Sequence, residues 1–260
     1  MSEKKLRPIV ECYNVDEEYL YQKPYLFIAG YAAGKNFKYT PKALPLARKL
    51  HDGQHRKGLV EVNGQMVHLP YVLHVLKVCD TLISLNIPMS DEDLDILCTC
   101  ALLHDTLEDA EEYFPQGGIE YERDYGFPAI VGETIKLLSK HAGADEYELN
   151  AYFNAIKVNK FALLVKLADR SHNVEDLYNM KNVPKYIKET RDYFISKNGL
   201  CAYGRQNYPE MSHAITILKA KILSLTEATE AMLHRQDERI AEKDARIAEL
   251  EAEIEKLKNV

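Results

Sequence analysis

The sequence predicts an all-α protein, a helical bundle with one small β-hairpin and a C-terminal coiled-coil helix. Apolar residues recur at helical spacing over most of the chain, as in the buried-looking run 96–103. One segment, 60–67, instead alternates apolar and polar residues around Asn63-Gly64, the strongest short-range signal for a hairpin. Near the C-terminus a seven-residue pattern repeats twice in succession. These three observations together set the expected fold class.

Composition and charge limit the classes of protein to which this chain can belong. The 260 residues are enough for one domain with a sizeable core and an extension, and 46% are hydrophobic. A net charge of −7 argues against a long nucleic acid as partner, because such binding neutralises many phosphates. No apolar run approaches a membrane span, and the start, Met-Ser-Glu-Lys-Lys, lacks a secretory stretch. The expected location is therefore cytoplasmic, with no membrane partner.

The five cysteines do not form a recognisable framework. They contain no CxxC pair of the zinc-binding type, and their odd number argues against a complete set of disulfides. We expect reduced, buried thiols that behave as small apolar side chains.

Helix boundaries can be placed at several points along the chain. Residues 1–39 form an N-terminal extension without clear periodicity, and Thr40-Pro41 then gives a helix start with a capping hydroxyl before a first-turn proline. Ser90 is the expected N-cap of the helix that contains the apolar run. Residues 130–139 and 147–158 also show helical periodicity.

Residues 104–109, His-Asp-Thr-Leu-Glu-Asp, are the most informative segment. On a continuous helix, positions four apart share a face, so one face would carry His104, Asp105, Glu108 and Asp109. A bound divalent cation would relieve the repulsion among these carboxylates, and the preceding apolar run directs them inward. The segment therefore predicts a metal site. The alternative is an ordinary acidic helix end.

Two further groups of residues strengthen the metal hypothesis. In 164–173, Asp169 and Asn173 share a helical face, with Lys166 one turn earlier. Upstream, 70–74 reads Pro-Tyr-Val-Leu-His, and 51–57 reads His-Asp-Gly-Gln-His-Arg-Lys. The chain thus presents His-x-Gly-Gln-x-Arg-Lys, Pro-Tyr-x-x-His, Ala-Leu-Leu-His-Asp-Thr-x-Glu-Asp and Val-Lys-Leu-Ala-Asp-Arg-x-His-Asn in that order.

These motifs, in this order, resemble the HD superfamily of metal-dependent phosphohydrolases. The closer likeness is to the hydrolase domain of the RelA/SpoT alarmone enzymes and their small stand-alone relatives, and it covers residues 40–230. The resemblance implies a divalent metal held by His74, His104, Asp105 and Asp169. It assigns the acidic pair of these hydrolases to Glu108 and Asp109. Arg56, Lys57 and Asn173 match positions that line the nucleotide and phosphate pocket.

The mixed nitrogen and oxygen ligands suit Mn²⁺, the metal expected, with Fe²⁺ and Zn²⁺ as alternatives. Lys166 is a further candidate for substrate binding, or else an ion-pair partner beside the metal ligands. The implied reaction is hydrolysis of the 3′-pyrophosphate of guanosine tetra- or pentaphosphate to GDP or GTP and pyrophosphate. Two alternatives stay open: a phosphohydrolase for another nucleotide, including the 2′-phosphate of NADPH, and a catalytically silent module that binds nucleotides.

The chain departs from the family pattern at three places. Residues 58–69 intervene where the link between Arg-Lys and Pro-Tyr is usually short, and they contain the predicted hairpin. Val75 stands where proline commonly follows the ligand histidine, and Ser171 where leucine is usual. None of these changes replaces a predicted ligand, so they bear on the substrate more than on the metal.

Residues 231–260 predict a coiled coil that joins copies of the chain. The pattern Arg-Ile-Ala-Glu begins at residues 239 and 246, seven apart. One seam position holds Leu233, Ile240, Ile247 and Ile254, and the other holds Gln236, Lys243, Leu250 and Leu257. Isoleucine at the first position with leucine at the second favours a parallel two-stranded form. The alternative is a solitary charged helix stabilised by side-chain pairs.

Overall fold

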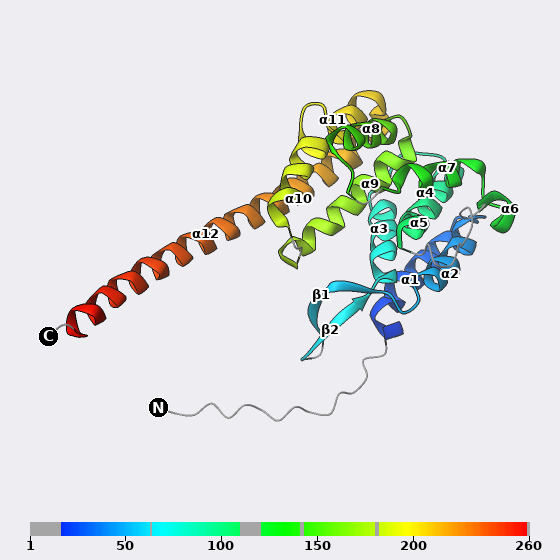
Figure 1. Cartoon of the computed structure of the whole chain (residues 1–260). Coiled ribbons are helices and arrows are strands. Elements are labelled where there is room, and N and C mark those ends of the chain that lie inside the picture. Colours follow the sequence, from blue (N-terminus) through cyan, green and yellow to red (C-terminus); the bar gives the residue numbers. More distant parts are fainter. Residues whose placement is uncertain (1–16, 63, 110–120, 141–142, 180–181, 259–260) are drawn as a thin grey trace. The chain divides into compact units, whose positions relative to one another are not determined.

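The computed structural model describes residues 17–62, 64–109, 121–140, 143–179 and 182–258. They belong to two compact units, Met1–Ala168 and Asp169–Val260 (Figure 1). The predicted domain limits at residues 39 and 230 stay predictions. Within the described part of the chain, no helix combines the length and the apolar character that crossing a bilayer requires.

The described residues of the first unit are helical apart from one antiparallel strand pair, which confirms the predicted fold class. Its elements are α1 (Glu17–Gly34), α2 (Thr40–Leu50), β1 (His55–Val62), β2 (Gln65–Pro70), α3 (Val72–Ser84), α4 (Asp91–Leu103), α5 (Thr106–Asp109), α6 (Tyr121–Tyr125), α7 (Ala129–Leu138) and α8 (Glu146–Lys157). Helix α9 (Lys160–Asn173) contains residues of both units. The helices expected at 130–139 and 147–158 are confirmed as α7 and α8, each one residue earlier.

The core of this unit is centred on α4. Helix α4 packs against α2, α3 and α7, and α3 also packs against α1. All the residues of the run 96–103 are buried, as the sequence predicts. Each large apolar side chain buried in this way stabilises the fold by roughly 1.5–3 kcal/mol. The core therefore holds both ends of α4 in place, including the end that leads into His104.

The buried thiols agree with the expected role of the cysteines. Cys79, Cys98, Cys100 and Cys201 are free and buried, whereas Cys12 lies outside the described residues. Burial raises the pKa of the Cys100 thiol to about 12, so it stays protonated at neutral pH.

The start of α2 differs from the prediction. Thr40 does not cap the helix with its hydroxyl. The buried carboxylate of Asp95 on α4 instead accepts the hydrogen bonds of the backbone N–H groups at the start of α2. Asp95 accepts hydrogen bonds from the backbone N–H groups of Lys38, Tyr39 and Thr40 at 2.6, 2.9 and 2.7 Å. The Thr40 hydroxyl donates to the same carboxylate at 2.7 Å. One side chain therefore satisfies the unpaired amides at the start of α2 and ties this helix to α4. Ser90, by contrast, caps α4 as predicted, accepting from Asp93 N–H at 3.1 Å.

The predicted hairpin is confirmed and is longer than expected. β1 and β2 pair in an antiparallel register that sets Val62 opposite Gln65 and Leu59 opposite His68. Gly64, in the turn, has φ +81°, which favours glycine. The register is irregular between His55 and Leu59, near the Arg-Lys pair of the motif. Figure 1 shows that the hairpin leads directly into α3, which carries His74.

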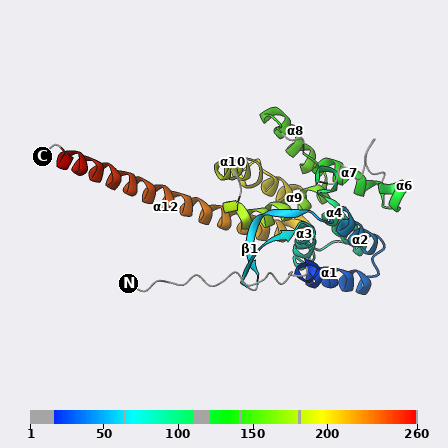
Figure 2. The same cartoon turned by 60° about the horizontal axis from the view of Figure 1, so that its bottom comes forward.

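The second unit is dominated by one long helix. Its other elements are η2 (Val174–Asn179), α10 (Val183–Glu189), the π-helical turn η3 (Thr190–Ile195), α11 (Leu200–Asn207) and η4 (Pro209–Met211), and α12 follows (Ser212–Lys258). Helix α12 packs against α11, η2, η3 and η4. Figures 1 and 2 show its last turns, coloured red, running beyond α10 and α11 as one uninterrupted helix.

A buried arginine joins α9 to α10 and η3. The guanidinium of Arg170 lies between the rings of Tyr186 and Phe194, at 4.0 and 4.2 Å from their centres. It also donates to Glu189 Oε1 at 2.5 Å and to Thr190 Oγ1 at 3.0 Å. Stacking and charged hydrogen bonds together compensate for burying this cation.

Candidate active site

Three of the four predicted metal ligands lie together in the first unit. They are His74 on α3, and His104 and Asp105 at the end of α4, and we refer to them as the His–Asp cluster. One ligand atom from each lies within 4.8 Å of the others. Oδ2 of Asp105 is 3.0 Å from His104 Nε2 and 3.4 Å from His74 Nε2. Two buried imidazole nitrogens and one carboxylate oxygen are a donor set that fits Mn²⁺, Fe²⁺ or Zn²⁺.

The orientation of His104 suits this role. Its Nδ1 lies 2.8 Å from the carbonyl oxygen of Ala101, which can only accept a hydrogen bond. Nδ1 therefore carries a proton, and Nε2 is the ring nitrogen directed at Asp105. Histidines that bind metals are commonly oriented in this way, by a carbonyl on the other nitrogen.

The backbone at these residues is not the continuous helix that the sequence analysis assumed. α4 ends at Leu103, His104 and Asp105 form a turn, and α5 begins at Thr106. The turn is stabilised by Thr106, whose hydroxyl donates to the Leu103 carbonyl at 2.6 Å. That residues four apart share one face here therefore stays a prediction. The turn instead brings His104 and Asp105, which are neighbours in sequence, to the same point.

Tyr71 connects the cluster to the His-x-Gly-Gln segment. Its hydroxyl donates to Oδ2 of Asp105 at 2.7 Å, and its ring lies 5.6 Å from the His74 ring. On its other side is the ring of His51, at 5.0 Å. The sequence analysis did not assign Tyr71 to the site. Its position three residues before His74, on the same side of a helix, is the signal that could have indicated it.

The acidic pair lies just beyond the cluster. Glu108 on α5 accepts a hydrogen bond from the backbone N–H of Lys140, after the end of α7. Its carboxylate is thus fixed by a segment 32 residues later. Asp109 is the last residue of α5, and its side chain lies outside the described residues.

The remaining predicted residues lie on α9 and β1. Asn173 donates from its side-chain amide to Asp169 Oδ1, which confirms that these two share a helical face. Both belong to the second unit, so the place of Asp169 among the ligands stays a prediction. Lys166, in the first unit, has its Nζ 5.9 Å from the centre of the Tyr152 ring.

Arg56 and Lys57 occupy neighbouring positions of β1. Arg56 is half-buried and Lys57 is exposed. The carbonyl oxygen of Arg56 lies 3.0 Å from Nδ1 of His68 on β2, so the second strand holds this part of the first. Their contact with substrate stays a prediction.

Three named proteins are similar in sequence to the chain. It is 32% identical over 157 residues to the guanosine-3′,5′-bis(diphosphate) 3′-pyrophosphohydrolase MESH1 of Drosophila melanogaster, covering 59% of this chain and 78% of that protein. It is 27% identical over 167 residues to the guanosine-3′,5′-bis(diphosphate) 3′-pyrophosphohydrolase of Borreliella burgdorferi, and 26% identical over 194 residues to the putative chloroplastic GTP diphosphokinase RSH1 of Oryza sativa subsp. japonica. The alignments cover 62% and 68% of this chain but only 21% and 20% of those two proteins.

A solved structure has the same fold. It is described as a metazoan ortholog of SpoT that hydrolyzes ppGpp, and it matches with a TM-score of 0.51 and 19% identity over 74% of this chain and 95% of that one. No family model matches the chain. The identity to MESH1 over most of that protein's length nevertheless decides the family. The chain belongs to the HD-type alarmone hydrolases, the family of MESH1.

Proposed function

We propose that this protein hydrolyses the 3′-pyrophosphate of guanosine tetra- or pentaphosphate, giving GDP or GTP and pyrophosphate. The observation that carries the proposal is the His–Asp cluster, which lies in a chain of the family that includes the pyrophosphohydrolase MESH1. Water supplies the hydroxyl that joins phosphorus, the bond from phosphorus to the ribose 3′-oxygen breaks, and that oxygen takes the proton.

The cluster, completed by Asp169, would hold one divalent metal, with Mn²⁺ as the expected ion. When bound, the metal lowers the pKa of a coordinated water and polarises the phosphorus–oxygen bond. His74 and His104 would bind the ion through Nε2, and the carboxylates of Asp105 and Asp169 would together balance its two positive charges. The Ala101 carbonyl keeps His104 in the tautomer that this requires.

Glu108 is the proposed general base. The Lys140 amide fixes the position of its carboxylate, which would orient or deprotonate the attacking water. Asp109 would support the same water or the neighbouring ligands. Arg56, Lys57 and Lys166 would neutralise charge on the phosphoryl oxygens, and Asn173 would position the ribose or base.

We further propose that copies of the chain associate through residues 233–258 of α12. The apolar seam residues of this segment are exposed, with Ile240, Ile247 and Ile254 at 56, 53 and 51%. A truncation after Met232 is expected to lower the mass in solution, and an unchanged mass would contradict the proposal. The cytoplasmic location inferred from the sequence stays a prediction.

A nucleotide panel tests the activity. Full-length protein freed of metal with a chelator is reloaded with Mn²⁺ and incubated separately with guanosine tetraphosphate, NADPH and other nucleotides. Release of pyrophosphate from the tetraphosphate supports the proposal. Orthophosphate from another nucleotide would support a different phosphohydrolase, and binding without turnover would support a silent module. His74→Gln serves as the metal-deficient control.

A further inference from the structure

The His-x-Gly-Gln segment has no assigned role in the site above, yet it touches the site through Tyr71. We infer that His51, Gln54 and Tyr71 form a support that fixes Asp105 as a metal ligand. This inference rests on the proposed metal site, and it makes Tyr71 a positioning residue of the reaction.

The contact between Tyr71 and Asp105 is specific. The phenol donates to Oδ2, the oxygen that also lies nearest to both histidine nitrogens. A carboxylate oxygen has two lone-pair directions, so it can accept this hydrogen bond and bind a cation at the same time. The phenol therefore sets the direction in which the other lone pair points.

The segment before β1 in turn fixes Tyr71. The carbonyl oxygen of Gln54 accepts the backbone N–H of Tyr71 at 2.7 Å. The side-chain oxygen of Gln54 lies 2.8 Å from Nδ1 of His51, whose buried ring packs against the Tyr71 ring. Gly53 permits the tight turn between His51 and Gln54, because its φ is +71°. Backbone and ring of Tyr71 are thus both held by one turn.

This arrangement explains why the His-x-Gly-Gln and Pro-Tyr-x-x-His motifs occur together. The first builds the turn, and the second places Tyr71 on that turn and His74 in the cluster. His51 resembles a metal ligand by residue type, and in this turn its ring contacts Gln54 and Tyr71.

Mn²⁺ affinity, measured by titration calorimetry on full-length metal-free protein, tests the inference. Tyr71→Phe keeps the ring and removes the donor, and we expect affinity to fall about 10- to 100-fold, the usual effect of losing an outer hydrogen bond to a ligand. Raising Mn²⁺ to saturation should restore most of kcat. Tyr152→Phe is the matched control, because its hydroxyl also donates at 2.7 Å, to the Leu138 carbonyl.

A second variant covers the case in which Tyr71→Phe does not fold. Gln54→Met keeps the volume and removes the acceptor from His51, so it should weaken Mn²⁺ binding several-fold. Combined with Tyr71→Phe it should add nothing further, because both act through the same hydrogen bond. Unchanged affinity in folded Tyr71→Phe, with wild type binding Mn²⁺, would overturn the inference. Failure of wild type to bind would instead overturn the metal site.

The exposed face of α12 supports an independent second inference. Ile222 and Thr226 are buried against the second unit and Leu233 is half-buried. The same face continues, at intervals of three, four or seven residues, beyond Leu233. Its apolar side chains there are all at least 40% exposed: Ile240, Ile247, Leu250, Ile254 and Leu257. We call these five residues the α12 seam. Helix α12 thus changes at Leu233 from a face covered by its own unit to an apolar face left open.

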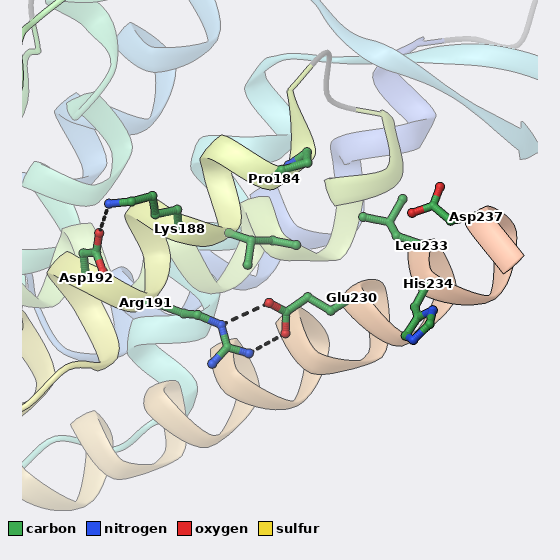
Figure 3. Close-up of a pocket in the computed structure, with 9 residues that line it drawn as sticks. Pro184, Lys188, Arg191, Asp192, Glu230, Leu233, His234 and Asp237 are labelled. Atoms are coloured by element: carbon green, nitrogen blue, oxygen red, sulfur yellow. Dashed lines mark hydrogen bonds and ion pairs between the residues drawn. The ribbon is translucent and has the colours of Figure 1, made fainter.

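Leu233 also lines a groove of about 550 Å³ between α12, α10 and η3. Figure 3 shows the ion pair of Arg191 with Glu230 across this groove, and Leu233, His234 and Asp237 on its α12 side. The groove therefore lies where α10 stops packing against the apolar face of α12 and the α12 seam begins.

We propose that a second copy of this chain covers the α12 seam in a parallel, in-register pair. This inference rests on the proposed association and specifies its geometry. In a parallel pair, the residue that precedes each seam isoleucine lies next to a residue of the partner helix whose number is five higher. Those pairs are Arg239 with Asp244, Arg246 with Glu251, and Glu253 with Lys258. All three join opposite charges.

The antiparallel pair with comparable apolar layers fits less well. In that pair Asp244 of each helix faces Glu251 of the other, so this contact between like charges occurs twice. In the parallel pair, Arg246 must exchange its contact with Glu249 of the same helix, at 2.9 Å, for one with the partner. That exchange costs little, because both contacts lie at the surface.

Disulfide trapping in full-length protein tests this geometry. Ile254→Cys should form a covalent dimer with itself under mild oxidation, whereas Glu255→Cys, which faces outward, and wild type should not. Lys243→Cys mixed with Ile254→Cys should give no mixed dimer, because in-register residues 11 apart are about 16 Å apart along the axis. A mixed dimer would establish the antiparallel form and overturn the proposal. A protein that stays monomeric in solution would overturn the association itself.

Discussion

The carboxylate of Glu108 accepts a hydrogen bond from the backbone N–H of Lys140. This contact fixes the proposed base from a segment that carries no predicted ligand. Because an amide oxygen can accept the same hydrogen bond, the position of residue 108 can be kept while its basicity is removed.

Glu108→Gln should therefore lower kcat about 10²- to 10⁴-fold, the usual effect of losing a general base, with little change in Mn²⁺ affinity. Steady-state kinetics and a metal titration on the same preparation measure both. Glu133→Gln, on the exposed surface of α7, is the control. An active Glu108→Gln enzyme would remove Glu108 from the proposed mechanism.

Removal of the hairpin should affect substrate binding and leave metal binding unchanged. The strand pairing holds the part of β1 that carries Arg56 and Lys57, and His68 contacts the carbonyl oxygens of Arg56 and Gly58 at 3.0 and 3.2 Å. Replacing residues 59–68 by a short turn should raise KM for guanosine tetraphosphate several-fold while Mn²⁺ affinity stays constant. An unchanged KM would show that the insertion does not shape the pocket rim.

Arg170→Lys should destabilise the fold by about 3 kcal/mol. Lysine cannot stack between two rings, and it cannot replace both of the hydrogen bonds that the buried guanidinium donates to Thr190 and to the half-buried Glu189. Chemical denaturation measures the loss. Arg191→Lys is the matched control, since Arg191 pairs with Glu230 at the surface and should lose less than about 1 kcal/mol. An equal fall in the free energy of unfolding of the two variants would contradict the claim that the buried Arg170 contributes more to stability than the surface Arg191.

Asp95→Asn should also be costly, by about 3 kcal/mol, because the amide cannot match a carboxylate that accepts three backbone N–H groups and a hydroxyl. Asp91→Asn, which alters an exposed pair with Lys35, should cost less than about 1 kcal/mol. Thermal and chemical unfolding of both proteins would test this. Similar stabilities would refute the role of Asp95 as the cap of α2.

The parts of the structure that depend on local pattern could be predicted from the sequence. Helical periodicity located α4, α7 and α8, and Asn63-Gly64 located the hairpin. The motifs also identified His74, His104 and Asp105, which the structure brings together although His74 is 30 residues from His104. The motifs could predict this meeting because one lies at the start of α3 and the other at the end of α4, and these two helices pack together in the core.

The parts that depend on distant contacts could not be predicted. Asp95 caps a helix that starts 55 residues earlier, and Lys140 fixes Glu108 from 32 residues later. No periodicity encodes such pairs. The turn at His104 and Asp105 was missed for a different reason, since residues 104–109 contain no glycine or proline that would signal a break in the helix.

The most direct test of the central claim is the product balance of one reaction. Mn²⁺-loaded wild-type protein is incubated with guanosine tetraphosphate, and the phosphorus products are followed over time by ³¹P NMR, with Asp105→Asn in parallel. We expect GDP and pyrophosphate in equal amounts from wild type and neither from Asp105→Asn. Orthophosphate as the first product, or equal turnover by Asp105→Asn, would contradict it.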